Sequence, residues 1–180
     1  LRKLPYDPIK DFIFITQIAS SQYFLSTHPS LPVKSVPEFI ALAKSKPGAL
    51  AYGSAGHGSA LHMAAALFDY MAGTKMTHVP YRGVGAAYPD LLGGQIQLVF
   101  ASSISAMPQI QAGRLRALAV TSAQRKSELP DIPTMREGGA EFVATLLTGV
   151  VTPAGAPAPV IEKLNAAINE GLRSPDMKET

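Results

Sequence analysis

The sequence predicts an α/β fold, and three observations support that prediction. Between residues 35 and 121, segments with the apolar spacing of a helix alternate with short apolar runs typical of buried strands. The helical segments are about 10–15 residues long, as in right-handed βαβ units on a parallel sheet. The chain has 180 residues, of which 47% are hydrophobic and 16% charged, so it is long enough to bury a core.

The first helix is expected to begin after Ser35. Ser35 and Glu38 have the spacing of a capping box, in which the hydroxyl accepts a first-turn amide and the carboxylate reaches back. Pro47-Gly48 would end this helix. Its apolar face would consist of Val36, Phe39, Ile40 and Ala43.

Further helices and strands follow in alternation. Strands are expected at 50–52, 76–79, 96–100 and 115–121. Helices are expected at 84–92 and 104–112, besides one with an apolar stripe of Leu61, Ala65, Phe68 and Ala72. Each of these helices is followed by a glycine, which suits a helix C-terminus: Gly73, Gly93 and Gly113. Pro89 lies inside the helix at 84–92 and is expected to shorten or kink it.

The segments on either side of this lobe have a different pattern. Two β-rich runs, 12–19 and 23–27, precede it, and the irregular stretch 123–140 follows it. A strand at 147–151 then leads to a last helix, whose stripe consists of Val160, Leu164, Ala167, Ile168 and Leu172. One strand and one helix cannot bury each other's apolar faces completely. These terminal pieces are therefore expected to belong to a second lobe that is incomplete here.

The predicted organisation has three parts. Residues 1–24 would form part of the first lobe and a crossover strand, and residues 25–121 a complete α/β lobe. Residues 122–180 would form the return crossover and another part of the first lobe. Ser174-Pro175-Asp176 has the pattern of a new helix start, so the chain is expected to be cut at both ends.

Composition argues against several classes of function. The formal net charge is +3, but the basic residues are scattered and lack interleaved aromatic residues, so nucleic-acid binding is not expected. The nearest approach to a basic cluster consists of Arg114, Arg116, Arg125 and Lys126. The chain has no cysteine, which excludes thiol catalysis, cysteine metal sites and disulfides. No apolar run approaches the roughly 20 residues that span a bilayer.

The stretch AYGSAGHGSALHMAA, residues 51–65, is the most distinctive local feature. A Walker-type phosphate loop needs a lysine, and Gly53–Ser59 has the glycine spacing without it. A dinucleotide fingerprint fails at its third glycine, where Leu61 stands. A nucleophile elbow needs glycines two residues before and after its serine, and neither Ser54 nor Ser59 has both.

His57 and His62 are the candidate metal ligands of this stretch. They are five residues apart, a spacing that does not place both on one helical face as i and i+4 would. Asp69 is the only acidic residue nearby. No metal site is therefore expected, and these histidines are interpreted as hydrogen-bonding or solvent-facing.

The remaining interpretation needs no special side chain. A strand that runs through glycine and serine into a helix exposes unpaired amides with a partial positive charge, which suit a carboxylate. Ser54 and Ser59 would add hydroxyl donors, and the turn would lie at the carboxyl end of a parallel strand, where open α/β sheets bind ligands. An ordinary turn capped by Ser59 accounts for the residues equally well, so both interpretations remain open.

Two more segments end neighbouring strands in the same way. Val79–Gly83 contains Arg82, whose guanidinium suits a carboxylate, and Phe100–Ser103 contains two serines. Because parallel strands end at the same edge of a sheet, these segments and the glycine-rich turn could converge on one cleft.

Eight segments, taken together and in order, resemble the solute-binding receptors of tripartite tricarboxylate transporters, also called Bug receptors. The resemblance runs along almost the whole chain. The segments are LPYDPIKDF (4–12), HPSLPVKSVPEFIALAKSKPG (28–48), YGSAGHGSALHMAAALF (52–68), HVPYRG (78–83), DLLGGQIQLVF (90–100), GRLRALAVTS (113–122), LPDIPTMREGG (129–139) and PAGAPAPVIEKLNAAI (153–168).

The resemblance implies a fold like that of type II periplasmic binding proteins (Venus flytrap), with a ligand cleft between two α/β lobes. It implies a binding protein and not an enzyme, with no catalytic residue, no cofactor and no metal. Family ligands are small carboxylic acids: dicarboxylates, tricarboxylates, acidic amino acids and aromatic acids. The implied ligand-binding residues are Ser54, Ala55, Gly56, Gly58, Ser59, His62, Tyr81, Arg82 and Ser102. The glycine-rich loop that forms the other jaw in the family is expected to be absent here.

The resemblance also implies a periplasmic location and delivery of the ligand to the membrane subunits of such a transporter. Two departures from the family pattern are expected to matter. Ala101 stands where members often carry Asp, and Leu147 stands near a usual aromatic position. Loss of the acidic group removes a partner for a ligand ammonium, which favours a plain carboxylic acid over an amino acid.

Two other functions remain as alternatives. A small hydrolase or transferase could use Ser54 or Ser59 with a nearby histidine. A regulatory domain of similar shape would be expected to carry a fused DNA-binding or signalling segment, and none is recognised in the 180 residues.

Overall fold

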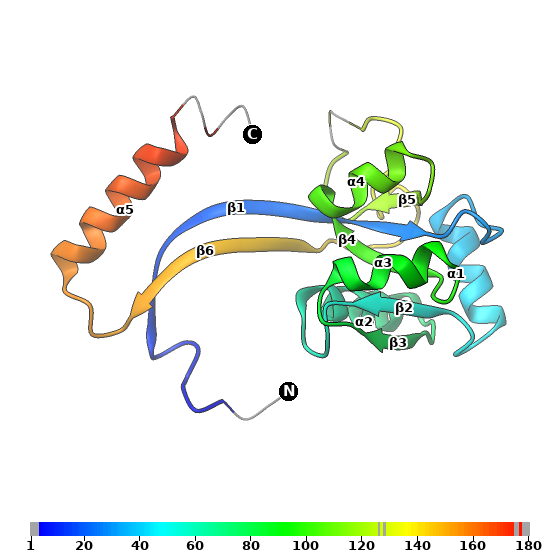
Figure 1. The fold of residues 1–180 in the computed structure, drawn as a ribbon, viewed down its shortest axis with the longest axis horizontal. Helices are drawn as coiled ribbons and strands as arrows, with labels where there is room; N and C mark the ends of the chain where they lie inside the picture. Colours follow the sequence, from blue (N-terminus) through cyan, green and yellow to red (C-terminus); the bar gives the residue numbers. More distant parts are fainter. Residues whose placement is uncertain (1–3, 126, 128, 175–176, 178–180) are drawn as a thin grey trace. The chain divides into compact units, whose positions relative to one another are not determined.

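The computed structural model describes residues 4–125, 127, 129–174 and 177. Lys126 of the predicted basic cluster and Pro175-Asp176 of the predicted helix start lie outside the described residues. The elements, labelled in Figure 1, are β1 (Phe12–Thr27), α1 (Val36–Ser45), β2 (Ala51–Ser54), α2 (Ala60–Ala72), β3 (Thr77–Pro80), α3 (Val84–Leu92), β4 (Leu98–Ser102), α4 (Ser103–Gln111), β5 (Arg116–Val120), β6 (Thr145–Pro153) and α5 (Ala158–Leu172).

The chain divides into two compact units. One consists of Leu1–Ser20 and Leu147–Thr180, and the other of Ser21–Leu146. The larger unit contains the alternating helices and strands that the sequence predicts, and it carries every predicted ligand-binding residue.

The sheet of the larger unit has the strand order β3-β2-β4-β1-β5. β2 pairs in parallel with β3 and β4, as βαβ units require. β1 is antiparallel to both of its neighbours, with Leu25 opposite Phe100 of β4 and Ala119 of β5. The sheet is therefore parallel-rich and not wholly parallel, because the end of β1 is inserted between two strands that follow it in sequence.

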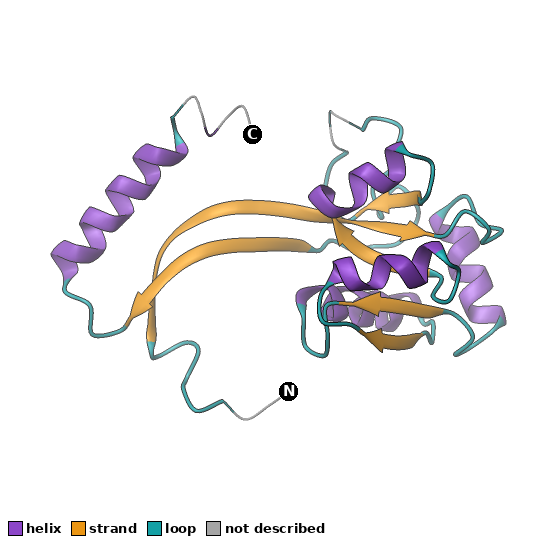
Figure 2. Cartoon of the chain, in the orientation of Figure 1, coloured by secondary structure: helices purple, strands orange, loops and turns teal. Residues whose placement is uncertain are grey.

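Helices cover both faces of this sheet, which makes three layers (Figure 2). α1 and α2 pack on one face, against strand residues that include Leu25, Leu98 and Phe100. α3 and α4 pack on the other face, against Phe24, Val99 and Ala101. Successive residues of β1 and β4 thus point to opposite faces, and both faces are apolar because each meets a helix layer.

The ends of the helices follow the local sequence signals. Ser35 Oγ accepts the amide of Glu38 at 3.4 Å, while the Glu38 carboxylate accepts the amide of Lys34 at 2.7 Å. The carboxylate thus reaches back one residue further than the capping box predicts. Gly73 closes α2 in the left-handed conformation with φ 62°. α3 keeps the predicted bounds with Pro89 inside it. Pro89 deprives only the exposed residue Gly85 of a hydrogen-bond donor, and water can replace that donor.

Two differences from the predicted strands affect the site. The runs predicted at 12–19 and 23–27 form one continuous strand of 16 residues, β1. β2 continues two residues beyond its predicted end, so Ser54 belongs to the strand and pairs with Pro80 of β3. The polar residues Ser20, Ser21 and Gln22 suggest a break, but they lie inside the continuous strand.

The smaller unit contains the first part of β1, most of β6 and α5. Asn165 Nδ2 of α5 donates to the carbonyl of Ile15 at 2.7 Å, and Gly149 of β6 lies against the ring of Phe14. α5 buries none of its residues, and apolar Val160 and Leu164 remain exposed. No helix within the described ranges has the length and apolar character needed to cross a membrane.

Candidate functional site

The candidate site is the turn between β2 and α2, residues 55–59, together with the side chains around it. Ser54, the last residue of β2, is 0% exposed. Its hydroxyl accepts the amide of Gly56 at 3.1 Å and donates to the Gly56 carbonyl at 3.2 Å. Ser54 Oγ also lies 2.6 Å from Nε2 of His78 in β3. Ser54 therefore stabilises the turn from inside and does not present a hydroxyl to solvent.

Two glycines give the turn its shape. Gly56 has φ 107° and Gly58 has φ 77°, conformations that favour glycine. The amide of Gly58 donates to Nδ1 of His62 at 3.0 Å, and the amide of Ser59 donates to the carbonyl of Gly56 at 3.2 Å. Ser59 caps α2, since its hydroxyl accepts the amide of His62 at 3.3 Å.

The expectation of bare amides is therefore wrong for Gly56, Gly58 and Ser59, which already donate within the turn. Other amides are free. Within the part of the chain that the structure describes, four amides in or beside the turn have no hydrogen-bond partner: those of Ala55, His57, Ala60 and Leu61. We call these four the free amides. Of the five turn residues named from the sequence, only Ala55 contributes one.

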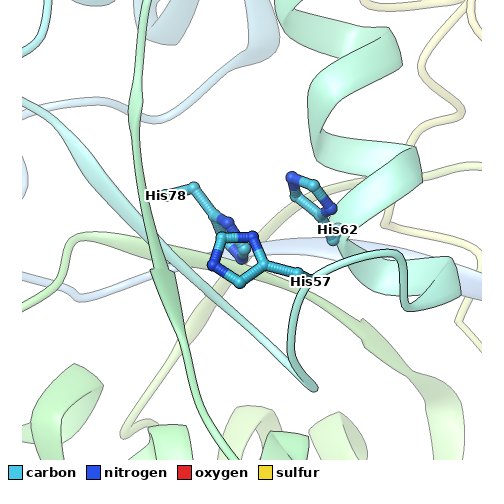
Figure 3. Close-up of side chains that lie close together, drawn as sticks. All are labelled: His57, His62 and His78. Atoms are coloured by element: carbon cyan, nitrogen blue, oxygen red, sulfur yellow. The ribbon is translucent and has the colours of Figure 1, made fainter. Parts of the chain in front are cut away.

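Three histidines gather beside the turn (Figure 3). His57 comes from the turn itself, His62 from α2 and His78 from β3. The rings of His62 and His78 are stacked with centroids 4.0 Å apart, and the ring of His57 stands nearly perpendicular to His78 at 4.9 Å. One ring nitrogen from each residue lies within 4.8 Å of the others. The ring of Tyr52 in β2 also stacks on the ring of His78, with centroids 5.0 Å apart.

Sequence spacing did not identify this histidine group. A metal pair on one helix would need the i and i+4 spacing, which His57 and His62 lack. The spacing of these two residues gives no information about His78, which comes from a different strand. Tyr52 and His78 are register partners in β2 and β3, which brings His78 to the turn. A search for histidines on strands predicted to neighbour β2 could have found it.

Burial makes His62 and His78 weaker bases, and we call these two the inner histidines. Burial, followed by electrostatic repulsion from His57, lowers the pKa of His62 below its ordinary value. Burial, followed by electrostatic repulsion from His62 and His57, lowers the pKa of His78 in the same direction. Both rings are therefore neutral at pH 7, with one nitrogen lone pair each.

Tyr81 and Arg82 follow β3 and have different roles. The amide of Tyr81 donates to the carbonyl of Ser54 at 3.1 Å, which fixes it beside the turn. Its hydroxyl donates to Oδ2 of Asp90 in α3 at 2.6 Å. Burial, followed by this hydrogen bond and the charge of Asp90, raises the pKa of Tyr81 to about 12. Arg82 is exposed, and its side chain makes no hydrogen bond or ion pair with the described residues.

Ser102 is the last residue of β4, and its hydroxyl lies 3.1 Å from that of Ser105 in α4. β4 is parallel to β2 in the sheet, so Ser102 and the turn lie at the same edge. The structure thus brings the turn, His62 and Tyr81 into direct contact, and it places Ser102 on the neighbouring strand. Ala101, where an acidic residue was expected from the resemblance, is 0% exposed and packs in the core.

Known proteins resemble this chain along almost its whole length. The family model described as the tripartite tricarboxylate transporter family receptor matches residues 1–180. A structure of Rpa4515 from R. palustris with adipate is 34% identical to this chain, with a TM-score of 0.89. The match covers 98% of this chain and 59% of the Rpa4515 chain. MatC from Rhodopseudomonas palustris with bound malate is 30% identical to this chain, with a TM-score of 0.89. That match covers 98% of this chain and 60% of the MatC chain.

The periplasmic binding protein BugD is 30% identical with a TM-score of 0.87, covering 97% of this chain and 58% of that chain. These structures confirm the predicted fold class, an α/β fold of the periplasmic-binding-protein kind. The chain spans about half the length of the curated relatives that it matches, for example 53% of one and 54% of another. Because the family model covers every residue, the chain belongs to the receptor family of the tripartite tricarboxylate transporters.

Proposed function

We propose that this chain belongs to an extracytoplasmic solute-binding protein that captures a small carboxylic acid and delivers it to the membrane subunits of a tripartite tricarboxylate transporter. The observation that supports this most strongly is the set of free amides at the turn between β2 and α2. These donors lie at a helix N-terminus, where a negative charge is favoured. The relatives solved with adipate and malate hold dicarboxylic acids, so we propose a dicarboxylate as the ligand.

The residues named from the sequence divide into two proposed roles. Ala55 would donate its amide to a ligand carboxylate, and Arg82 and Ser102 would add charged and hydroxyl donors from the ends of the next strands. The others would shape the turn or hold its side chains, as their hydrogen bonds indicate: Ser54, Gly56, Gly58, Ser59, His62 and Tyr81.

The domain organisation follows from the same proposal. Residues 25–121 would be the complete lobe that carries this site, and residues 1–24 and 122–180 would supply the crossovers and parts of the other lobe. The unburied apolar residues of α5 agree with an incomplete lobe. Family membership and the periplasmic protein BugD support a periplasmic location for this protein.

A serine-dependent hydrolase is the alternative that one contact favours. Ser54 Oγ lies 2.6 Å from His78 Nε2, as in a nucleophile and its base. Ser54 is fully buried, however, and its hydroxyl already bonds both backbone groups of Gly56. The other serine, Ser59, uses its hydroxyl to cap α2. A nucleophile must reach its substrate, so this arrangement favours binding without turnover.

The test is titration calorimetry of adipate and malate with the full gene product that contains these residues. We expect saturable binding of a dicarboxylate, and Arg82→Gln should weaken it about tenfold or more by removing one charge-assisted contact. Arg114→Gln is the matched control, because Arg114 is equally exposed but lies away from the site. No dicarboxylate binding, together with ester hydrolysis that Ser54→Ala or Ser59→Ala abolishes, would overturn the proposal.

A further inference from the structure

We propose that His57, His62 and His78 form a binding site for a divalent transition-metal ion of the zinc class. The three residues come from the turn, from α2 and from β3, and one ring nitrogen of each lies within 4.8 Å of the other two (Figure 3). Imidazole nitrogen is a preferred ligand of Zn²⁺, Ni²⁺ and Cu²⁺. The site stands on this geometry alone and does not depend on the proposed carboxylate.

The separation of the three nitrogens is close to what a metal needs. Zinc binds imidazole nitrogen at about 2.0–2.1 Å, so two ligands of a tetrahedral ion lie about 3.4 Å apart. A separation within 4.8 Å must therefore shorten by roughly 1.4 Å at most. His57 can supply most of that movement. Its side chain is exposed and makes no hydrogen bond with the described residues, so its ring is free to turn.

His78 can serve as a ligand because Ser54 holds one of its two ring nitrogens. Nε2 of His78 lies 2.6 Å from Ser54 Oγ, which also contacts the carbonyl of Gly56. In the tautomer that carries its proton on Nε2, that N–H donates to Ser54 Oγ and Nδ1 keeps a free lone pair for the ion. Metal-bound histidines usually donate their other ring N–H to a neighbouring oxygen, and the buried hydroxyl of Ser54 fills that position here.

His62 takes part at the expense of one hydrogen bond. The amide of Gly58 donates to its Nδ1 at 3.0 Å. A metal bound at Nδ1 displaces this amide directly, and a metal bound at Nε2 requires the ring proton at Nδ1, which displaces it as well. Metal binding therefore releases the amide of Gly58 and loosens the turn.

The rest of the chain has few other nitrogen or sulfur ligands for such an ion. It has no cysteine and four histidines, so His28 is the only histidine outside the group. His28 Nδ1 lies 2.6 Å from the hydroxyl of Ser30. Three imidazoles leave at least one position of a tetrahedral ion open, as in metal sites that bind an exchangeable ligand.

The experiment titrates ZnCl₂ by calorimetry into the untagged, chelator-treated full gene product that contains these residues, with the absorption spectrum of Co²⁺ as a second readout. We expect one ion per chain and visible Co²⁺ bands of a tetrahedral site. His57→Gln should weaken binding at least about tenfold and abolish the bands, because it removes one ligand. This variant is expected to fold, since His57 is exposed and its side chain makes no hydrogen bond with the described residues.

His28→Gln is the matched control and should bind like the unchanged chain. Absence of saturable binding at millimolar zinc would overturn the proposal. Binding that His57→Gln leaves unchanged, or that His28→Gln removes, would overturn it equally, because the ion would then lie elsewhere.

Discussion

The hydroxyl of Ser54 lies 2.6 Å from Nε2 of His78, and this contact joins the end of β2 to β3 beneath the glycine-rich turn. Ser54 is fully buried and also bonds both backbone groups of Gly56. One serine thus fixes the conformation of the turn and the orientation of a histidine ring. It is a structural centre of the site, which its position in a glycine-rich sequence did not indicate.

Ser54→Ala is therefore expected to lower the free energy of unfolding by about 1–3 kcal/mol, because it leaves the half-buried Gly56 amide and the His78 ring without their partner. Urea unfolding of both proteins measures the difference. Ser45→Ala is the control, since Ser45 is exposed and bonds only the Leu42 carbonyl of its own helix; its change should stay within about 0.5 kcal/mol. Equal stability of Ser54→Ala and the unchanged chain would contradict this assignment.

Gly53→Ala tests the packing under the site. A Cβ at Gly53 would lie 2.7 Å from Ile96 Cδ1 and 2.9 Å from Ala87 Cβ, so both of these neighbours must move. We expect a loss of about 1–3 kcal/mol in thermal or urea unfolding. Gly85→Ala in α3, where a Cβ meets nothing within 4 Å, should instead stabilise the helix by about 0.5–1 kcal/mol. The same loss for both variants would show that packing at Gly53 is not the cause.

Tyr81→Phe tests the bond between β3 and α3. The Tyr81 hydroxyl donates to Asp90, and its removal leaves a half-buried carboxylate without that donor. The expected loss of unfolding free energy is about 1–2 kcal/mol. Tyr70→Phe, at a side chain that is 86% exposed, should have no measurable effect. A Tyr81→Phe variant as stable as the Tyr70→Phe variant would mean that the hydrogen bond contributes nothing.

Acidification should destabilise the fold through the inner histidines. Burial, followed by neighbouring histidine charges, lowers the pKa of His62 and His78 from the ordinary 6.5 in the folded state. Between the two pKa values the unfolded chain binds more protons, so the free energy of unfolding falls as pH drops below 6.5 and is unaffected by these groups above it.

Urea unfolding at about pH 7.5 and about pH 5.5 measures this effect. The difference between the two pH values should shrink in His62→Gln, because one of the two contributing groups is gone. His28→Gln, outside the histidine group, should keep the full difference. A His62→Gln variant with an unchanged difference would remove His62 from the explanation.

Local sequence patterns predicted the helices well. The stripe from Leu61 to Ala72 and Gly73 after it locate α2, because both signals lie within the helix and its cap. The position of β1 in the sheet could not be predicted in this way. Its end lies between β4 and β5, strands about 70 or more residues later, and such pairing depends on how the whole unit packs.

The site was predicted only in part, for the same reason. The glycine-rich turn and its place at a strand end follow from local sequence. Which amides remain free does not, because His62 and Ser54 take up the amides of Gly58 and Gly56 through side-chain contacts. Gly56→Val illustrates the consequence. With φ 107° this residue needs glycine for its backbone, so valine would strain the turn itself and could not report on ligand contact alone.

The most direct test of carboxylate binding at this turn is an amide NMR titration of the full gene product with adipate. The largest shifts are expected at the four free amides, those of Ala55, His57, Ala60 and Leu61. Saturable shifts confined to residues away from this turn, or none at millimolar adipate and malate, would contradict it.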